Sequence, residues 1–238
     1  MLHDLRARVR AYLVRRLDVP EIEPALERMA RQGFTPELVF DVGAYRGTFA
    51  RTCRRVWPEA WIACFEPQDH AVRLLEALRQ TDDRLSIHPV LLGPAAREAV
   101  ALHEAETASS VLDEHVEQRH PTVEHAMQTV DGVVRDAYDG RPPDLLKLDV
   151  QGYELEVLKG AERSLPGVRA VLAEVNLLDL HVGVPLLADL AGWLSERGFV
   201  AFDVCGLTRR PLDEALWQAD MVFVPEDSPL RADKRWTG

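Results

Sequence analysis

Short apolar segments alternate with helix-forming segments along most of the chain, and this alternation limits the folds that the chain can adopt. The apolar segments that predict strands up to residue 175 are Leu38–Val42, Trp61–Phe65, Leu85–Leu91, Leu145–Val150 and Val168–Val175. Strands that alternate with helices favour a mostly parallel sheet with helices on both faces. The sequence therefore predicts an α/β fold with a doubly wound, mostly parallel sheet.

The C-terminal part of the chain extends this pattern by one helix and two strands. Leucines at helical spacing predict a helix over Pro185–Arg197. Phe199–Val204 and Asp220–Val224 predict the sixth and seventh strands, separated by a turn-like segment over Thr208–Leu216. The segment 99–130 departs from the alternation, and we interpret it as an insertion that carries a strand or two.

The first residues of the chain have a different character. Apolar residues recur at helical spacing among arginines over residues 1–18, which predicts a basic amphipathic helix, and a second helix follows Pro20. We therefore divide the chain into an N-terminal helical extension, residues 1–35, and a catalytic domain, residues 36–238. We favour a helical cap packed over the catalytic domain. The alternatives are a peripheral membrane contact through the basic helix and a homo-oligomer contact.

The charge balance limits the partners of the chain. There are 28 Lys and Arg residues against 39 Asp and Glu residues, a formal net charge of −11. Binding to nucleic acid phosphates needs a basic surface, so nucleic acid is not an expected partner. The three cysteines are scattered without a CxxC or Cys/His pattern, which predicts neither a zinc site nor a disulfide framework. Without a long apolar run or a signal-peptide core, we expect a soluble, cytoplasmic protein.

The segment Leu145–Glu162 combines a buried strand, an acidic strand end, a glycine turn and the start of a helix. In open α/β sheets, ligands bind beyond the carboxyl ends of the parallel strands. Asp149 and Glu154 are therefore expected at the ligand-binding edge of the sheet, with Gly152 in the turn between them. The segment predicts a polar functional site.

A glycine loop follows the first predicted strand. Gly43 and Gly47 form the pattern Asp-x-Gly-x-x-x-Gly, and such a loop lets the backbone approach a nucleoside cofactor closely. The dinucleotide fingerprint GxGxxG requires glycines where this chain has Tyr45 and Thr48. An NAD-dependent oxidoreductase is therefore disfavoured. A glycine turn with a purely structural role is the alternative interpretation of the loop.

Glu66 ends the second predicted strand and precedes Pro67. An acidic side chain at this place can accept hydrogen bonds from both ribose hydroxyls of a nucleoside. The alternative is an ordinary solvated carboxylate at a strand end. Since NAD and S-adenosylmethionine both contain ribose, Glu66 indicates a nucleoside without identifying it.

Several of these motifs occur together in one known family. The segments Asp41–Gly47, Phe65–Pro67, Ser109-Ser110 and Leu146–Gly160 resemble the FkbM family of S-adenosylmethionine-dependent methyltransferases, and the resemblance spans residues 36–204. The resemblance implies a Rossmann-like class I methyltransferase fold, with a seven-stranded sheet whose final strand is antiparallel. It also implies S-adenosylmethionine as the cofactor, and methyl transfer to a hydroxyl of a sugar, glycolipid or secondary-metabolite acceptor.

The resemblance also implies a set of cofactor-binding residues at the matching motif positions. These are Asp41, Gly43, Ala44, Tyr45, Gly47, Glu66, Pro67, Ser109 and Asp149. The Ser109-Ser110 pair has ordinary turn chemistry as its alternative interpretation.

Methyl transfer to a hydroxyl needs a group that takes the hydroxyl proton. Asp149 is the first candidate base, and two other roles are open to it, as a ligand of the methionine amino group and as a cap of the Gly152 turn. Glu174 ends the next strand, and His181, the second candidate base, follows it closely. Asp149, Glu174 and His181 lack a metal-specific spacing, so a divalent metal is left unassigned. A non-catalytic nucleoside-binding protein that retains the methyltransferase fold is the alternative function.

Overall fold

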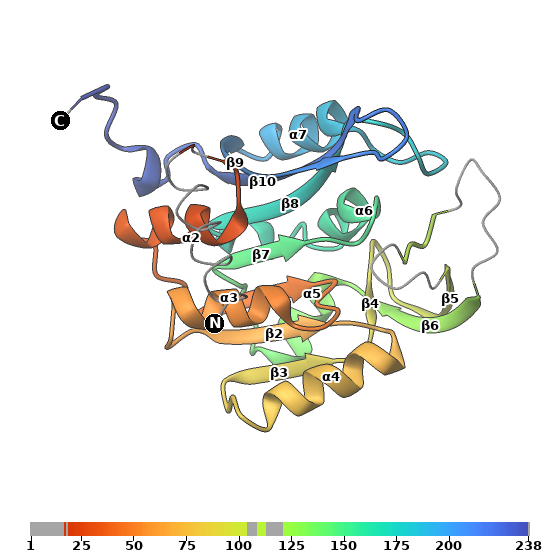
Figure 1. The fold of residues 1–238 in the computed structure, drawn as a ribbon. Helices are drawn as coiled ribbons and strands as arrows, with labels where there is room; N and C mark the ends of the chain where they lie inside the picture. Colours follow the sequence, from red (N-terminus) through yellow and green to blue (C-terminus); the bar gives the residue numbers. More distant parts are fainter. Residues whose placement is uncertain (1–16, 18, 104–108, 113–120, 238) are drawn as a thin grey trace, which may run out of the picture.

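The fold is described from a computed structural model of the chain, which covers residues 17, 19–103, 109–112 and 121–237 (Figure 1). The basic helix predicted over residues 1–18 lies almost entirely outside the described residues. The second predicted helix is present as α2 (Ile22–Arg31). The helical cap therefore stays a prediction. Within the described ranges, no helix is both long and apolar enough to cross a membrane.

A seven-stranded sheet in the order β3-β2-β1-β7-β8-β10-β9 forms the centre of the fold. All of its pairings from β3 to β8 are parallel, and β10 is antiparallel to both β8 and β9. The strands are β1 (Leu38–Val42), β2 (Trp61–Phe65), β3 (Leu85–His88), β7 (Leu145–Leu148), β8 (Ala170–Asn176), β9 (Phe199–Arg209) and β10 (Leu216–Pro225). The mostly parallel, seven-stranded sheet is confirmed.

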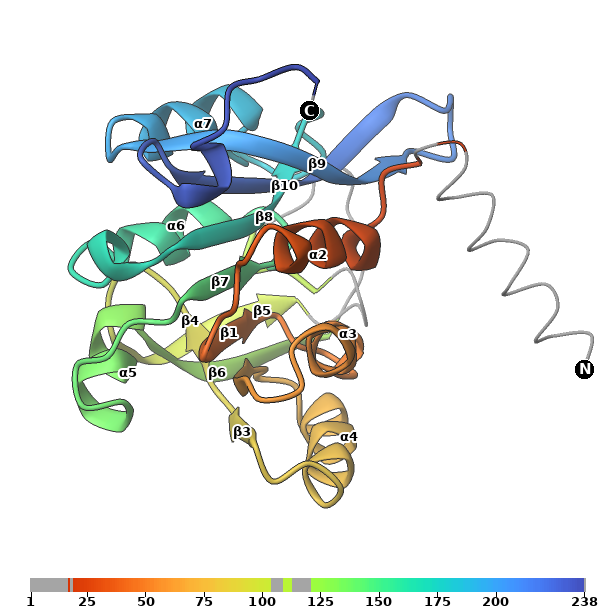
Figure 2. The same cartoon turned by 90° about the vertical axis from the view of Figure 1, so that its left-hand side faces the viewer.

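Helices cover both faces of this sheet, as Figure 2 shows with the sheet seen nearly edge-on. One face carries α2, α3 (Thr48–Val56) and α4 (Asp69–Arg79), and the other carries α5 (Val130–Ala137), α6 (Glu154–Lys159) and α7 (Leu187–Ser195). Short 3-10 turns lie at Leu165–Gly167 and Pro229–Arg231. The doubly wound arrangement is confirmed.

The alternation of side chains along β1 divides the core into two clusters. Phe40 packs in the cluster that includes Leu158 of α6, whereas Val39 packs in the cluster that includes Phe49 of α3. All four side chains are buried, and burial of a large apolar side chain contributes roughly 1.5–3 kcal/mol. Asp41 shares the Val39 face because successive strand residues alternate between faces, which places a carboxylate beneath α3.

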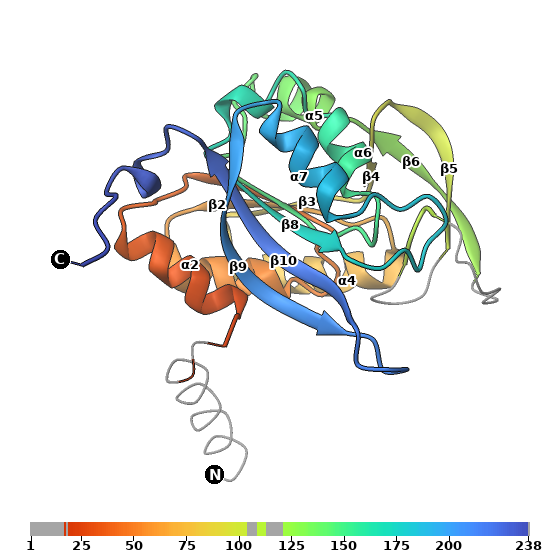
Figure 3. The same cartoon turned by 90° about the horizontal axis from the view of Figure 1, so that it is seen from above.

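A second, smaller sheet lies beside the first and has the order β4-β6-β5. It consists of β4 (Leu91–Leu92), β5 (Arg97–His103) and β6 (Thr122–Gln128), and it is seen from above in Figure 3. The strands expected within the segment 99–130 are thus present. The short segment 109–112 contacts β5 through backbone hydrogen bonds between Ser110 and His103.

The predicted bounds differ most from the structure in two places. The strand predicted over Leu85–Leu91 ends at His88, because Pro89 interrupts it and the chain then enters the smaller sheet at β4. The turn-like segment Thr208–Leu216 is shorter than predicted, because Thr208 and Leu216 belong to the long β9–β10 hairpin. Backbone pairing between these two strands continues past the apolar residues from which the strands were predicted.

Candidate functional site

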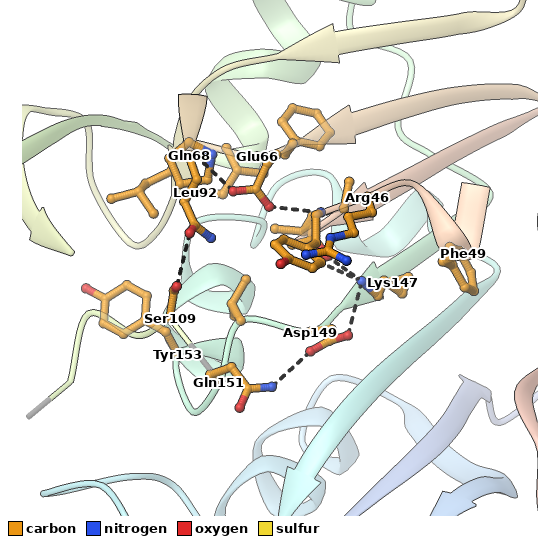
Figure 4. A pocket seen from close by; sticks show the side chains of 18 of the residues that line it. Arg46, Phe49, Glu66, Gln68, Leu92, Ser109, Lys147, Asp149, Gln151 and Tyr153 are labelled. Atoms are coloured by element: carbon orange, nitrogen blue, oxygen red, sulfur yellow. Dashed lines mark hydrogen bonds and ion pairs between the residues drawn. The ribbon is translucent and has the colours of Figure 1, made fainter. Parts of the chain in front are cut away.

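A cavity of about 360 Å³ lies beyond the carboxyl ends of β1, β2 and β7 (Figure 4). The smaller sheet and the segment 109–112 close one side of it. Its apolar lining includes Val42, Phe65, Val90, Leu91, Leu92, Leu102 and Val111, and its polar lining includes Glu66, Gln68, Ser109, Lys147, Asp149 and Gln151. An apolar wall with a few convergent polar groups is typical of a small-molecule site.

Gly43 is required where β1 leads into the cavity. Its φ is +74°, and a Cβ atom at this position would overlap the carbonyl oxygen of Asp149. The glycine therefore allows two backbone segments of the protein to touch. The left-handed conformation alone disfavours any other residue.

The backbone N–H groups of the glycine loop are used within the protein. Gly43 N and Ala44 N donate to the carbonyl of Phe65 at 3.0 and 3.1 Å, and Gly47 N donates to Ala44 O at 2.8 Å. Tyr45 has a φ of +44°, a conformation that favours glycine and costs a side-chain-bearing residue about 1–2 kcal/mol. Gly43, Ala44 and Tyr45 line the cavity, but these N–H groups are not free to bind a ligand.

Glu66 is held in place at the end of β2 by two backbone N–H groups. Tyr45 N donates to its Oε2 and Gln68 N donates to its Oε1, both at 2.9 Å. The residue is 2% exposed, and burial raises the pKa of its carboxyl against the opposing effect of these hydrogen bonds. The Gln68 side chain also donates to this carboxylate, which offers about four acceptor positions and so keeps one for a ligand.

A buried ion pair lies beneath the glycine loop. The parallel pairing of β1 with β7 aligns Asp41 with Lys147, and Lys147 Nζ lies 2.9 Å from Asp41 Oδ1. The ammonium also donates to the carbonyls of Gly43 at 2.9 Å and Val42 at 3.2 Å. Burial lowers the pKa of Lys147, but the carboxylates of Asp41 and Asp149 outweigh this effect and raise it above its usual value.

Asp149 lies at the cavity wall between a cation and an amide. Its Oδ2 is 3.4 Å from Lys147 Nζ, and its Oδ1 accepts a hydrogen bond from Gln151 Nε2 at 3.2 Å. The same Gln151 nitrogen donates to Glu174 Oε1 at 3.0 Å. Burial, together with the charges of Asp149, Glu154 and Asp220, raises the pKa of Glu174 well above its ordinary value. One amide therefore joins the two candidate carboxyls.

The turn after β7 is capped by Glu154. Its Oε1 accepts hydrogen bonds from Val150 N at 2.9 Å and Gly152 N at 3.2 Å. Glu154 is 2% exposed, and burial raises the pKa of its carboxyl to about 7. Of the three roles open to Asp149, capping of this turn therefore falls to Glu154.

The two neighbouring serines have different roles. Ser110 is 2% exposed, donates from Oγ to Gln151 O at 2.8 Å and accepts from Leu112 N at 3.1 Å. It attaches the segment 109–112 to the turn after β7. Ser109 lines the cavity and donates from Oγ to Gln68 Oε1 at 3.2 Å.

Four of the predicted site residues do not line the cavity. Asp41 is fully buried beneath it, and Gly47 starts α3 against the side chains of Leu75 and Leu78. Glu174 lies beyond Gln151, and His181 is 4% exposed and does not belong to the lining. Among the described residues, no group of three or more His, Cys, Asp or Glu side chains is arranged to hold a metal ion.

The sequence model of the methyltransferase FkbM domain matches residues 41–201, which is more than half of the chain. The chain belongs to the FkbM methyltransferase family. This match runs from the end of β1 through α7 to the start of β9, and it contains the small sheet. None of the curated protein sequences matches the chain.

Solved structures agree with the FkbM assignment at the level of the fold. The FkbM methyltransferase of Methylobacillus flagellatus KT is 19% identical, with a TM-score of 0.53, over 79% of this chain and 43% of that chain. This chain therefore spans less than half of that protein. The 1,6-didemethyltoxoflavin-N1-methyltransferase of Burkholderia thailandensis, solved with bound 1,6-didemethyltoxoflavin and S-adenosylhomocysteine, is 14% identical, with a TM-score of 0.47 over 94% and 90% of the two chains. The fold is of the class I methyltransferase type.

The FkbM motifs indicated where the site lies but missed several of its residues. Lys147, Gln68 and Gln151 line the cavity and were not predicted as site residues. Lys147 had a detectable signal, since it is the single charged residue within the apolar strand Leu145–Leu148. The two glutamines had none, because polar residues after a strand are common in any loop.

Proposed function

We propose that this chain is an S-adenosylmethionine-dependent O-methyltransferase that acts on a hydroxyl of a sugar, glycolipid or secondary-metabolite acceptor. The observation that supports it best is the Glu66 carboxylate. Two backbone N–H groups and the Gln68 side chain fix it at the cavity wall, and it keeps an acceptor position for a ribose hydroxyl.

The rest of the cavity fits the same cofactor. Val90, Leu91 and Leu92 provide an apolar wall beside Glu66 for the base of a nucleoside. Asp149 lies along the cavity from Glu66 and would hold the positively charged methionine end. When bound, S-adenosylmethionine supplies a methyl group that is activated by its positively charged sulfur.

The chain itself contributes alignment and proton acceptance. In-line displacement requires that the acceptor oxygen and the methyl carbon be held in line while water is excluded. We assign proton acceptance to Glu174, because burial and its acidic neighbours raise its pKa, so that its carboxylate is a stronger base than an exposed one. Gln151 donates to both Glu174 and Asp149, and this link to a residue of the cavity wall supports the assignment.

Isothermal titration with S-adenosylmethionine and S-adenosylhomocysteine tests the cofactor part of the proposal. We expect the parent protein to bind both ligands and Glu66→Ala to bind them about tenfold to a hundredfold more weakly. Glu76→Ala, which removes an exposed glutamate from α4, is the matched control and should bind like the parent. If the parent binds neither ligand, or Glu66→Ala binds like the parent, the proposal is wrong.

A screen of hydroxylated acceptors with radiolabelled S-adenosylmethionine tests the catalytic part. Transfer to an oxygen that is lost in Glu174→Gln, with unchanged cofactor binding, is the expected result. Cofactor binding without transfer to any acceptor in a broad screen would favour the non-catalytic nucleoside-binding alternative.

A further inference from the structure

The Lys147 ammonium faces more oxygens than it has N–H groups. An ammonium has three donors, and the three nearest oxygens are Asp41 Oδ1 and Gly43 O at 2.9 Å and Val42 O at 3.2 Å. Asp149 Oδ2, at 3.4 Å, is the fourth. The three N–H groups of Lys147 therefore have acceptors other than Asp149, and the contact between Lys147 and Asp149 is mainly electrostatic.

The Asp149 carboxylate keeps most of its capacity to bind a ligand. Among the described residues, its Oδ1 accepts one hydrogen bond from Gln151, and its Oδ2 has only the long contact with Lys147. Its side chain is 41% exposed at the cavity wall. An ionised carboxylate offers about four acceptor positions, so both oxygens remain open to a donor from the cavity.

The charges of this group do not cancel. Asp41 and Lys147 neutralise each other at 2.9 Å, which leaves the Asp149 charge uncompensated at the cavity wall. If Asp41 were uncharged, Lys147 would neutralise Asp149 instead. Asp41 does not line the cavity, yet its charge decides whether Asp149 presents a net negative charge to a ligand.

We propose that Asp41 is a positioning residue that acts through Lys147: it takes up the lysine charge, so that Asp149 receives the ammonium group of the cofactor's methionine end. This inference rests on the proposed function and adds a residue that does not touch the cofactor. It also gives a role to an aspartate of β1 that the cavity does not include.

The test compares ligands that have the ammonium group with one that lacks it. S-adenosylmethionine and S-adenosylhomocysteine carry the amino-acid end, and 5′-methylthioadenosine does not. In isothermal titration, we expect Asp41→Asn to weaken binding of the first two by about tenfold or more, and to change 5′-methylthioadenosine binding by less than about twofold. Asp82→Asn, which removes the partner of Arg54 away from the cavity, is the control and should affect none of them.

A compensating variant separates this role from a purely structural one. Asp41→Asn with Lys147→Met removes both charges of the pair and restores the net charge that Asp149 presents. It should bind all three ligands within about threefold of the parent. Ligand binding by the double variant also tests the role of Asp41 if Asp41→Asn alone does not fold, because the double variant contains no unpaired buried charge.

Each other outcome has a definite meaning. Equal weakening of all three ligands by Asp41→Asn, or no weakening, overturns the inference and leaves the proposed function standing. A double variant that binds S-adenosylmethionine tenfold more weakly than the parent also overturns the inference and leaves the proposed function standing. A parent protein that binds none of the three ligands overturns the proposed function, and the inference with it.

Discussion

The Tyr45 backbone N–H donates to Glu66 Oε2 at 2.9 Å and so ties the loop after β1 to the end of β2. The Gln68 backbone N–H donates to the other oxygen of this carboxylate, Oε1. This carboxylate therefore stabilises the fold in addition to the role proposed for it in ligand binding.

Glu66→Gln should separate the charge of this side chain from its shape. The amide has one acceptor oxygen, so one of the two backbone N–H groups faces an NH₂ group and loses its acceptor. We expect the free energy of unfolding in urea to fall by about 1–3 kcal/mol. Glu76→Gln should leave the free energy of unfolding unchanged. If Glu66→Gln also leaves it unchanged, the two backbone hydrogen bonds to Glu66 are contradicted.

Gly43→Ala should be far more damaging than alanine at another glycine of similar backbone conformation. A Cβ atom at Gly43 would overlap the Asp149 carbonyl oxygen, whereas one at Gly183, with φ +71°, meets nothing within 4 Å. We expect Gly183→Ala to cost about 1 kcal/mol and Gly43→Ala to cost about 4 kcal/mol or to prevent folding. Urea unfolding of both variants provides the comparison. Equal losses would show that only the backbone conformation matters.

The stability of the protein should fall as the pH rises from about 4 to about 7. Burial raises the pKa of Glu154 from 4.5 to about 7 and that of Asp220 from 3.8 to about 6. Between these values the folded chain binds more protons than the unfolded chain, so raising the pH favours unfolding, and the effect levels off above pH 7.

Glu154→Gln keeps an oxygen for Val150 N and Gly152 N but does not titrate. We expect the fall in unfolding free energy between pH 5 and pH 8 to shrink by roughly 1–3 kcal/mol in this variant. Urea unfolding at several pH values measures it. Glu162→Gln, which changes an exposed glutamate, is the control. An unchanged pH profile in Glu154→Gln would contradict the assignment of this pH dependence to Glu154.

Ser110→Ala should loosen the segment that closes the cavity. It removes the hydrogen bond to Gln151 O and the acceptor of Leu112 N, at a cost of about 1 kcal/mol each. Hydrogen exchange should become faster at Leu112 in particular. Ser109→Ala, one residue earlier, leaves both bonds in place and should leave the exchange at Leu112 unchanged.

The sheet could be predicted from the sequence because its strands are apolar where they cross the core. The outer part of the β9–β10 hairpin could not, since Thr208 and Arg209 pair through their backbones and carry no apolar pattern. The break after His88 was also missed, although Pro89 was a visible signal for it.

The candidate site could be predicted in outline, because strand ends and glycine loops are visible in a sequence. Glu66 and Asp149 lie at the cavity as expected. The link from Asp41 to Lys147 could not be predicted, because it depends on the register between β1 and β7, which are far apart in the chain. The capping role of Glu154 was not predicted either, because it shows only in the hydrogen bonds that its Oε1 accepts from Val150 N and Gly152 N.

The position of β10 also determines when the sheet can be completed during synthesis. In the described sheet, β9 pairs with β10 and with no other strand, while β10 also pairs with β8. As the chain leaves the ribosome, β9 therefore emerges before its partner exists. The parallel part from β3 to β8 can assemble earlier, whereas this edge must wait until residues 216–225 have been translated.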